Sequence, residues 1–197
     1  MAARGPAKNA NLRVIFVDAL SINDPNGRPL GSNRYVYLVA PVKDPGGASV
    51  QLVLGGLTDD SKDPTGPFGN FLLATVHKMA RSISTKNGSV VESQQWLFAA
   101  PSGERIEMRI RFERGAGFRS RRSETKYYSA KAPASYQISQ QQLILGILRN
   151  VTTHPADRVQ KFSFKVSGGS YAKLFAGPVE VLSWDNILSM DRTILQP

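Results

Sequence analysis

Cysteine is missing from this chain of 197 residues, and histidine occurs only twice. The lack of cysteine excludes disulfides, thiolate nucleophiles and cysteine-ligated metals, and it is typical of proteins from a reducing compartment. The two histidines are 77 residues apart, which makes a histidine-rich metal site improbable. We therefore predict no metal site and no cofactor.

Long apolar runs are also lacking, since no stretch approaches the roughly 18 residues that a membrane-spanning helix needs. The N-terminus has no apolar segment of the kind found in secretory signals. We therefore expect an intracellular, cytoplasmic protein. The hydrophobic content of 41% and charged content of 20% are typical of a soluble globular chain. We expect one domain over residues 1–197, with residues 1–11 as a flexible tail.

Acidic residues are scarce, with 15 Asp and Glu against 25 Lys and Arg. The resulting net charge of +10 and pI near 10.1 favour an anionic partner. That partner could be a nucleic acid, an anionic membrane surface or an acidic small molecule. The plain alternative is a basic protein whose charge binds nothing.

Most of the chain has the alternating, β-branched pattern of strands separated by Gly, Pro and Asn turns. The strand 105–113 is the clearest, because Ile106 and Met108 fall on one face while Arg105 and Glu107 fall on the other. We predict an α+β class that is mostly β, as one sheet-like or barrel-like domain. The predicted strands are 12–22, 34–42, 48–57, 87–100, 105–113, 158–166 and 177–188.

Two segments favour helices near 70–84 and 139–151. In the first, apolar residues recur close to a helical period, whereas Lys78 and Arg81 lie off that stripe. The second segment, SQQQLILGILRNV, has Ser139 as a candidate N-cap. We expect both helices to pack on the sheets.

The first helix would carry the pair His77-Lys78, the first candidate for chemistry. A lysine among apolar neighbours can have a lowered pKa and act as a Schiff-base nucleophile, and histidine titrates near neutrality. Adjacent helical residues point about 100° apart, so the two side chains could not line one wall equally. The alternative is the solvated face of an ordinary amphipathic helix.

The second candidate is the basic segment 105–126, whose second half, 114–126, we expect to be a Gly- and Ser-containing loop. Eight Lys or Arg residues here outnumber three Glu, and aromatic residues lie among and just after them. Such a segment could bind phosphates and stack bases. The alternative is the solvent face of a sheet that runs into a mobile loop. The cations expected to contact nucleic acid or an anionic membrane are Arg105, Arg119, Arg121, Arg122 and Lys126.

From Arg34 onward the order of segments resembles the acetoacetate decarboxylase superfamily, over about 165 residues. YLVAPV is similar to that family's first strand, and GGASVQLVLGG to its turn and second strand. GNFLLATVHK has the spacing of the family's lysine motif, and SQQWLFAAPSGERIEMRIRF resembles its hairpin. GGSYAKLF and PVEVLSWDNILSMD are similar to its C-terminal motifs.

The resemblance implies a pocket with catalytic residues His77, Lys78 and Tyr35 and substrate-binding residues Asn70, Arg109, Arg111 and Trp96. Departures from the family motif imply changed chemistry. His77 occupies the Schiff-base position, where an imine would not be stable, and Tyr35 replaces the pocket glutamate. His77 would act as general acid or base, and Lys78 would bind a carboxylate or enolate.

Two main functions follow. The first is an enzyme of this superfamily, a lyase, cyclase or isomerase that acts on an acidic or polyketide-like metabolite, with arginines that attract the anionic ligand. The second is a non-enzymatic structural protein of the viral coat or matrix kind, which self-assembles and binds RNA or anionic membrane through basic patches. A monomeric nucleic-acid-binding module is a third possibility, resting on residues 105–126 alone. We expect a homo-oligomer.

Overall fold

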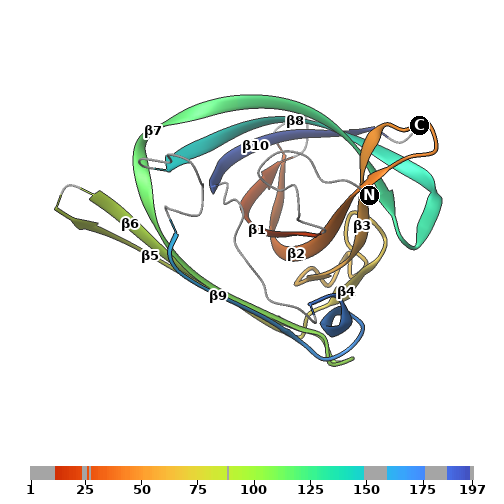
Figure 1. Cartoon of the computed structure of the whole chain (residues 1–197), viewed down its shortest axis with the longest axis horizontal. Coiled ribbons are helices and arrows are strands. Elements are labelled where there is room, and N and C mark those ends of the chain that lie inside the picture. The colour runs from red at the N-terminus through yellow and green to blue at the C-terminus, as the bar shows by residue number, and fades with distance from the viewer. Residues whose placement is uncertain are drawn as a thin grey trace.

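Extended strands make up most of the chain that the computed structural model describes, namely residues 12–23, 26, 28–87, 89–148, 159–175 and 186–195 (Figure 1). The mostly β class is therefore confirmed. The strands are β1 (Arg13–Asn23), β2 (Pro29–Lys43), β3 (Ser49–Thr58), β4 (Phe71–Leu73), β5 (Val76–Lys86), β6 (Ser89–Ala99), β7 (Arg105–Ser129), β8 (Ala132–Leu148), β9 (Val159–Ser167) and β10 (Asn186–Leu195), with a short 3₁₀ helix, η3 (Tyr171–Phe175).

The predicted strands over 12–22, 34–42, 48–57, 87–100, 105–113 and 158–166 correspond to β1, β2, β3, β6, the first part of β7, and β9. The predicted strand 177–188 overlaps β10 only at its end, and its residues 177–185 lie outside the described residues. The predicted tail over residues 1–11 lies outside them as well. The described strands do not close into a barrel, because the hydrogen-bonded path runs from β1 to β5 without joining these two.

The predicted helix near 70–84 is wrong. Residues Phe71–Leu73 pair in parallel with β3, and Val76–Lys86 pair in antiparallel fashion with β6 along their whole length. Met79 and Ile83 lie four residues apart, a spacing that fits one face of a helix and equally fits one face of a strand. The neighbouring strand decides between them, and β-branched residues such as Thr75 and Val76 favour the extended form.

The predicted helix near 139–151 is also wrong, since β8 runs to Leu148 between β7 and β10. Residues 149–151 lie outside the described residues. The run LILGIL is apolar without a clear period, so its sequence alone does not separate a buried strand from a helix. Ser139, the expected N-cap, is instead a buried strand residue, and its Oγ accepts a hydrogen bond from Gln141 at 3.0 Å.

The loop expected over residues 114–126 is strand. β7 continues for 25 residues, from Arg105 to Ser129, and would be about 80 Å long if it were straight. A register shift between Arg114 and Phe118 interrupts its pairing with β8. Such irregularities bend a strand and increase its twist, and β7 curves strongly in Figure 1.

This bend divides β7 between two layers. Its first half lies between β6 and β9, and β5 completes a four-stranded antiparallel layer. Its second half pairs with β8, and Tyr127–Ser129 pair in parallel with β3. The antiparallel strands β1, β2 and β3 therefore belong to the same hydrogen-bonded sheet as the four-stranded layer. Because the sheet bends at β7, the layer of β1–β3 nevertheless packs face to face against the four-stranded layer.

The main core fills the space between these faces. Val36 and Leu38 from β2 meet Phe98 from β6 and Ile106 and Phe112 from β7, and all five are almost completely buried. Alternation sends the neighbouring residues of β2 to the opposite face, where a second core forms under the loop 59–70. That core contains Tyr35, Tyr37, Val39, Val53, Phe68, Phe71 and Tyr127.

The 3₁₀ helix η3 is anchored to β3. The Tyr171 hydroxyl donates a hydrogen bond of 3.0 Å to the carbonyl oxygen of Gly56, and the Tyr171 ring is buried. At Gly55, with φ of +154°, an added Cβ would lie 2.5 Å from that hydroxyl, so the close approach requires glycine. In the part of the chain that is described, no helix has the length and apolar character needed to cross a membrane.

Candidate functional site

His77 and Lys78 point to opposite faces of β5, because successive strand residues alternate. His77 Nδ1 lies 3.5 Å from Asp59 Oδ2, whereas Asp59 Oδ1 accepts a hydrogen bond of 2.7 Å from the backbone N–H of Arg34. Both His77 and Lys78 are exposed. The two residues therefore do not line one wall of a common pocket.

The other residues of the predicted pocket also lie apart. Tyr35 is part of the second core, with its ring centroid 6.0 Å from that of Phe71. Trp96 lies in the main core, on the other side of β2 and β3, and its Nε1 donates to Gln94 Oε1 at 3.0 Å. Asn70 is part-buried, and its Nδ2 donates to the Val53 carbonyl at 2.9 Å. Each has a structural partner in its own surroundings.

Arg109 and Arg111, by contrast, lie together on the outward face of the four-stranded layer. Ile110, between them, is buried in the main core, which sends both arginines to the opposite side. Ser163 and Lys161 of β9 are their direct cross-strand partners. Cross-strand partners are about 5 Å apart and alternate residues of one strand about 7 Å, so Arg109, Arg111 and Lys161 form a close group of cations.

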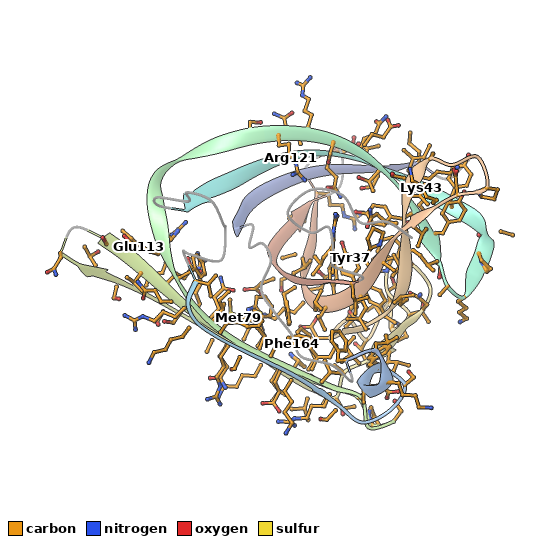
Figure 2. All side chains as sticks on the ribbon, viewed as in Figure 1. Tyr37, Lys43, Met79, Glu113, Arg121 and Phe164 are labelled. Carbon is orange, nitrogen blue, oxygen red and sulfur yellow. The ribbon has the colours of Figure 1, made fainter. Side chains whose placement is uncertain are left out.

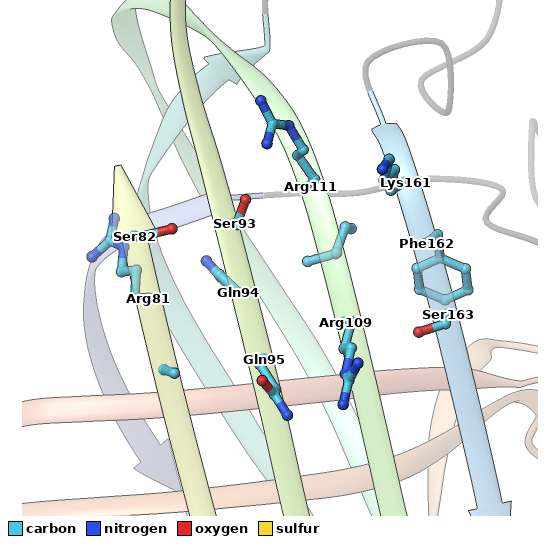
Figure 3. A pocket seen from close by; sticks show the side chains of 12 residues that line it. Arg81, Ser82, Ser93, Gln94, Gln95, Arg109, Arg111, Lys161, Phe162 and Ser163 are labelled. Atoms are coloured by element: carbon cyan, nitrogen blue, oxygen red, sulfur yellow. The ribbon is translucent and has the colours of Figure 1, made fainter. Parts of the chain in front are cut away.

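A depression of about 730 Å³ lies over this group, with lining residues from β5, β6, β7 and β9, and Figure 3 shows their side chains. Beside the cations, on the side of β6 and β5, lie short or amide side chains, including Ser93 and Gln95 from β6 and Ser82 from β5. Hydroxyl and amide groups can donate hydrogen bonds to the same anion that the cations attract. The complete lining is Ala80, Arg81, Ser82, Ser93, Gln94, Gln95, Arg109, Ile110, Arg111, Lys161, Phe162 and Ser163.

The whole outward face is basic. Among the residues whose side chains the structure describes, strand alternation places six Lys or Arg residues and two Glu residues on it, and we call this surface the basic face. No ion pair among the described residues holds Arg109, Arg111 or Lys161. The cations of the basic face are Lys78, Arg105, Arg109, Arg111, Lys161 and Lys165, and its carboxylates are Glu107 and Glu113.

One of the two carboxylates is already neutralised by the surrounding cations. Glu107 Oε1 accepts a hydrogen bond of 2.7 Å from Arg105 Nε. This hydrogen bond lowers the pKa of Glu107, and the charges of Arg105, Lys165 and Arg109 lower it further. Glu107 therefore stays ionised and offsets Arg105, whereas the charge of the Arg109–Arg111–Lys161 group remains available to an anion.

The cations predicted to act together in segment 105–126 are divided by the structure. Arg121 and Arg122 are exposed on opposite faces of β7, since they are adjacent on one strand. Lys126 lies 3.8 Å from the centroid of the Tyr136 ring and 3.8 Å from Asp44 Oδ2. A hydrogen bond with Tyr128 and the nearby charges raise the pKa of Lys126. The side chain of Arg119 lies outside the described residues.

Lys161 and Lys165 were missed by the sequence reasoning, although the strand that carries them was recognised. In RVQKFSFKV the lysines alternate with Phe162 and Phe164, which predicts a basic face opposite an apolar one. The missing information was the partner strand, since these two lysines of β9 pair with residues of β7 that lie 50 positions (Arg111 with Lys161) or more (Glu107 with Lys165) earlier in the chain.

No group of three or more His, Asp or Glu side chains in the described ranges could hold a metal ion. Comparisons with protein-family models, with curated proteins and with solved structures give no match. The resemblance to the acetoacetate decarboxylase superfamily therefore stays a prediction.

Proposed function

We propose that this protein is a non-enzymatic structural protein, of the coat or matrix kind, that binds the phosphate backbone of RNA through the basic face. The observation that carries the proposal is the group of Arg109, Arg111 and Lys161, none of which forms an ion pair with a described carboxylate. Lys and Arg groups that neutralise phosphates release bound counterions, and this release drives binding that does not depend on sequence.

The composition of the face favours RNA over a membrane surface. Serine and glutamine side chains lie beside the cations and can supply further donors to phosphate oxygens. Membrane-surface binding is strengthened by apolar side chains that enter the acyl boundary. Of the exposed large apolar residues Val76, Ile83, Leu174 and Leu195, only Val76 shares this face, at its corner on β5.

The test compares two triple variants that remove the same amount of charge. Arg109→Ser, Arg111→Ser and Lys161→Ser empty the centre of the basic face. The control replaces Lys43, Lys62 and Lys131 by Ser, and these residues lie in turns and at a strand end away from the four-stranded layer, as Lys43 does in Figure 2. Fluorescence anisotropy would follow binding to a labelled single-stranded RNA of about 20 nucleotides at moderate salt.

We expect the first variant to bind at least about tenfold more weakly, and the control to change affinity by less than about threefold. Equal weakening by both variants would mean that net charge alone is responsible, and would contradict a specific role for the basic face. Binding to vesicles rich in phosphatidylserine, without binding to RNA, would replace the proposal by the membrane alternative.

An enzyme acting on an acidic metabolite stays the other prediction. Its support is the approach of His77 Nδ1 to Asp59 Oδ2 at 3.5 Å, because a carboxylate beside an imidazole can hold the ring in one orientation for proton transfer. Because Lys78 points to the other face, His77→Gln is the informative variant. Turnover of an acidic or polyketide-like metabolite by the wild type, and its loss in His77→Gln, would support the enzyme.

A further inference from the structure

β5 is an edge strand of the four-stranded layer. Over all of its 11 residues it pairs with β6, and among the described strands it pairs with no other (Figure 1). An edge strand presents a row of backbone N–H and C=O groups that another strand can pair with. β5 contains no proline, and its central charge, Arg81, is bound to Glu92 within the same layer.

We propose that β5 pairs in antiparallel fashion with β5 of a second copy of this chain, about a two-fold axis at Arg81. Arg81 is the midpoint of the strand, so this register pairs the strand along its whole length. It places Ala80 opposite Ser82, Met79 opposite Ile83 and Lys78 opposite Ser84 of the other copy. Because residues paired in this way share a face, the two basic faces would form one continuous surface.

The side chains that meet in this register are complementary. Met79 and Ile83 face inward and make an apolar pair, which would cover Ile83, now 51% exposed. On the outward face Ala80 and Ser82 are small, and Lys78 meets the neutral Ser84. The two Arg81 side chains meet at the axis, where each already has a carboxylate partner in Glu92 at 2.6 Å.

β9, the opposite edge of the same layer, lacks this complementarity. The equivalent two-fold axis at its midpoint, Ser163, would place Lys161 directly opposite Lys165 twice. Like charges directly opposite each other destabilise a strand pair. The charge pattern therefore selects β5 as the edge that joins the two copies.

The chain contains no cysteine, which allows a register-specific crosslinking test on RNA-free protein. One preparation carries Ala80→Cys and another carries Ser82→Cys, and the two are mixed and oxidised. Direct cross-strand partners have Cα atoms about 4.5–5.5 Å apart, within the range that a disulfide spans. Positions 80 and 84 would be diagonal neighbours about 7–8 Å apart, so a mixture of Ala80→Cys with Ser84→Cys is the matched control.

We expect a disulfide-linked dimer mainly in the 80 and 82 mixture, and little in the control mixture or in either single variant alone. Light scattering should give a dimer for the wild type and for Ser84→Glu, whose carboxylate would meet Lys78 of the other copy. Ser84→Lys should weaken the dimer, because it creates two like-charge pairs, while its thermal unfolding as a monomer stays unchanged.

A wild type that remains monomeric over the accessible concentrations, or equal crosslinking in all mixtures, would overturn this inference. The inference does not depend on the proposed function. A monomer that still binds RNA through Arg109, Arg111 and Lys161 would contradict the strand pairing and leave RNA binding in place. A dimer without RNA affinity would contradict the proposed RNA binding and leave the strand pairing in place.

Discussion

The carboxylate of Glu92, which has no exposed surface, is held by the guanidinium of Arg81 on the neighbouring strand. Arg81 Nε donates to Oε1 at 2.6 Å and Nη2 donates to Oε2 at 3.2 Å. Gln94 Nε2 donates to Oε1 at 2.7 Å, and Arg114 Nε lies 3.5 Å from Oε2. A charge buried on the inward side of a sheet is tolerated because these partners replace water.

Removing Arg81 should therefore destabilise the fold. We expect Arg81→Ala to lower the free energy of unfolding by about 2 kcal/mol, less than for a fully buried pair because Arg81 is 37% exposed. The double variant Arg81→Met, Glu92→Leu should recover part of this loss, since it removes the buried carboxylate, but only part, because Arg114 and Gln94 then lose the partner that Glu92 provided. Urea denaturation measures both, with Arg109→Ala as an exposed control. An Arg81→Ala protein as stable as that control would show that the pair contributes little.

Alkaline pH should weaken the anchor between η3 and β3. Burial raises the pKa of Tyr171 to about 12, from 10.0, and the negative charge of Glu104 acts in the same direction. A phenol with a raised pKa stabilises the fold fully below pH 10 and loses that contribution as the pH rises from 10 towards 12. Tyr171→Phe should cost about 1 kcal/mol at neutral pH and flatten the alkaline decline. Urea titrations at several pH values would show whether the two slopes differ.

Acid should weaken a second contact near the same helix. The hydrogen bond from Ser102 lowers the pKa of Glu104 below 4.5, against the effect of burial, and backbone N–H groups of Glu104 and Ser170 lower it further. A carboxyl with a lowered pKa stabilises the fold above its unfolded pKa and loses that contribution as the pH falls through the folded value. Ser102→Ala should reduce the melting temperature at pH 7, and the difference should shrink below about pH 4. A difference that is constant with pH would contradict this assignment.

The salt dependence of RNA binding reports how many phosphates the basic face contacts. For single strands the logarithm of the association constant falls with the logarithm of salt concentration at about 0.7 per neutralised phosphate. The Arg109→Ser, Arg111→Ser, Lys161→Ser variant should therefore lose about 2 from this slope. Anisotropy titrations at several salt concentrations would measure it. An unchanged slope would mean that these cations do not contact phosphates.

Strands with strict alternation were predictable from the sequence, because burial on one face imposes the period. Ile106, Met108, Ile110 and Phe112 lie in the core as expected, and their outward neighbours form the centre of the basic face. The segment around Met79 and Ile83 was not predictable in this way, since its spacing fits both a helix and a strand. Only the pairing with β6 makes this segment a strand. That pairing depends on the sequences of both segments, so it cannot be inferred from one of them.

The candidate site shows the same division. Arg109 and Arg111 were recognised from their own strand, but they were assigned to a pocket together with Tyr35, Asn70 and Trp96. That grouping relied on chain order and took no account of strand partners. The structure instead adds Lys161, which comes from β9, and places Tyr35 and Trp96 in two different cores. Residues from distant segments meet only after the register of each strand is fixed.

The shared strand β7 also bears on how the chain folds. β1, β2 and β3 can pair as soon as they are made, but β3 meets residues 127–129 and β7 meets residues 159–167, which are synthesised much later. Bringing such distant segments together costs conformational entropy before any favourable contact between them forms, so these contacts slow folding. Until β9 pairs with β7, the main core lacks the side chains of Phe162, Phe164 and Val166, and the core residues that they cover stay exposed. The chain is therefore most prone to aggregate in the interval before β9 has been synthesised and paired with β7. Its dependence on chaperones should follow the rate at which the segment from β7 to β9 is translated.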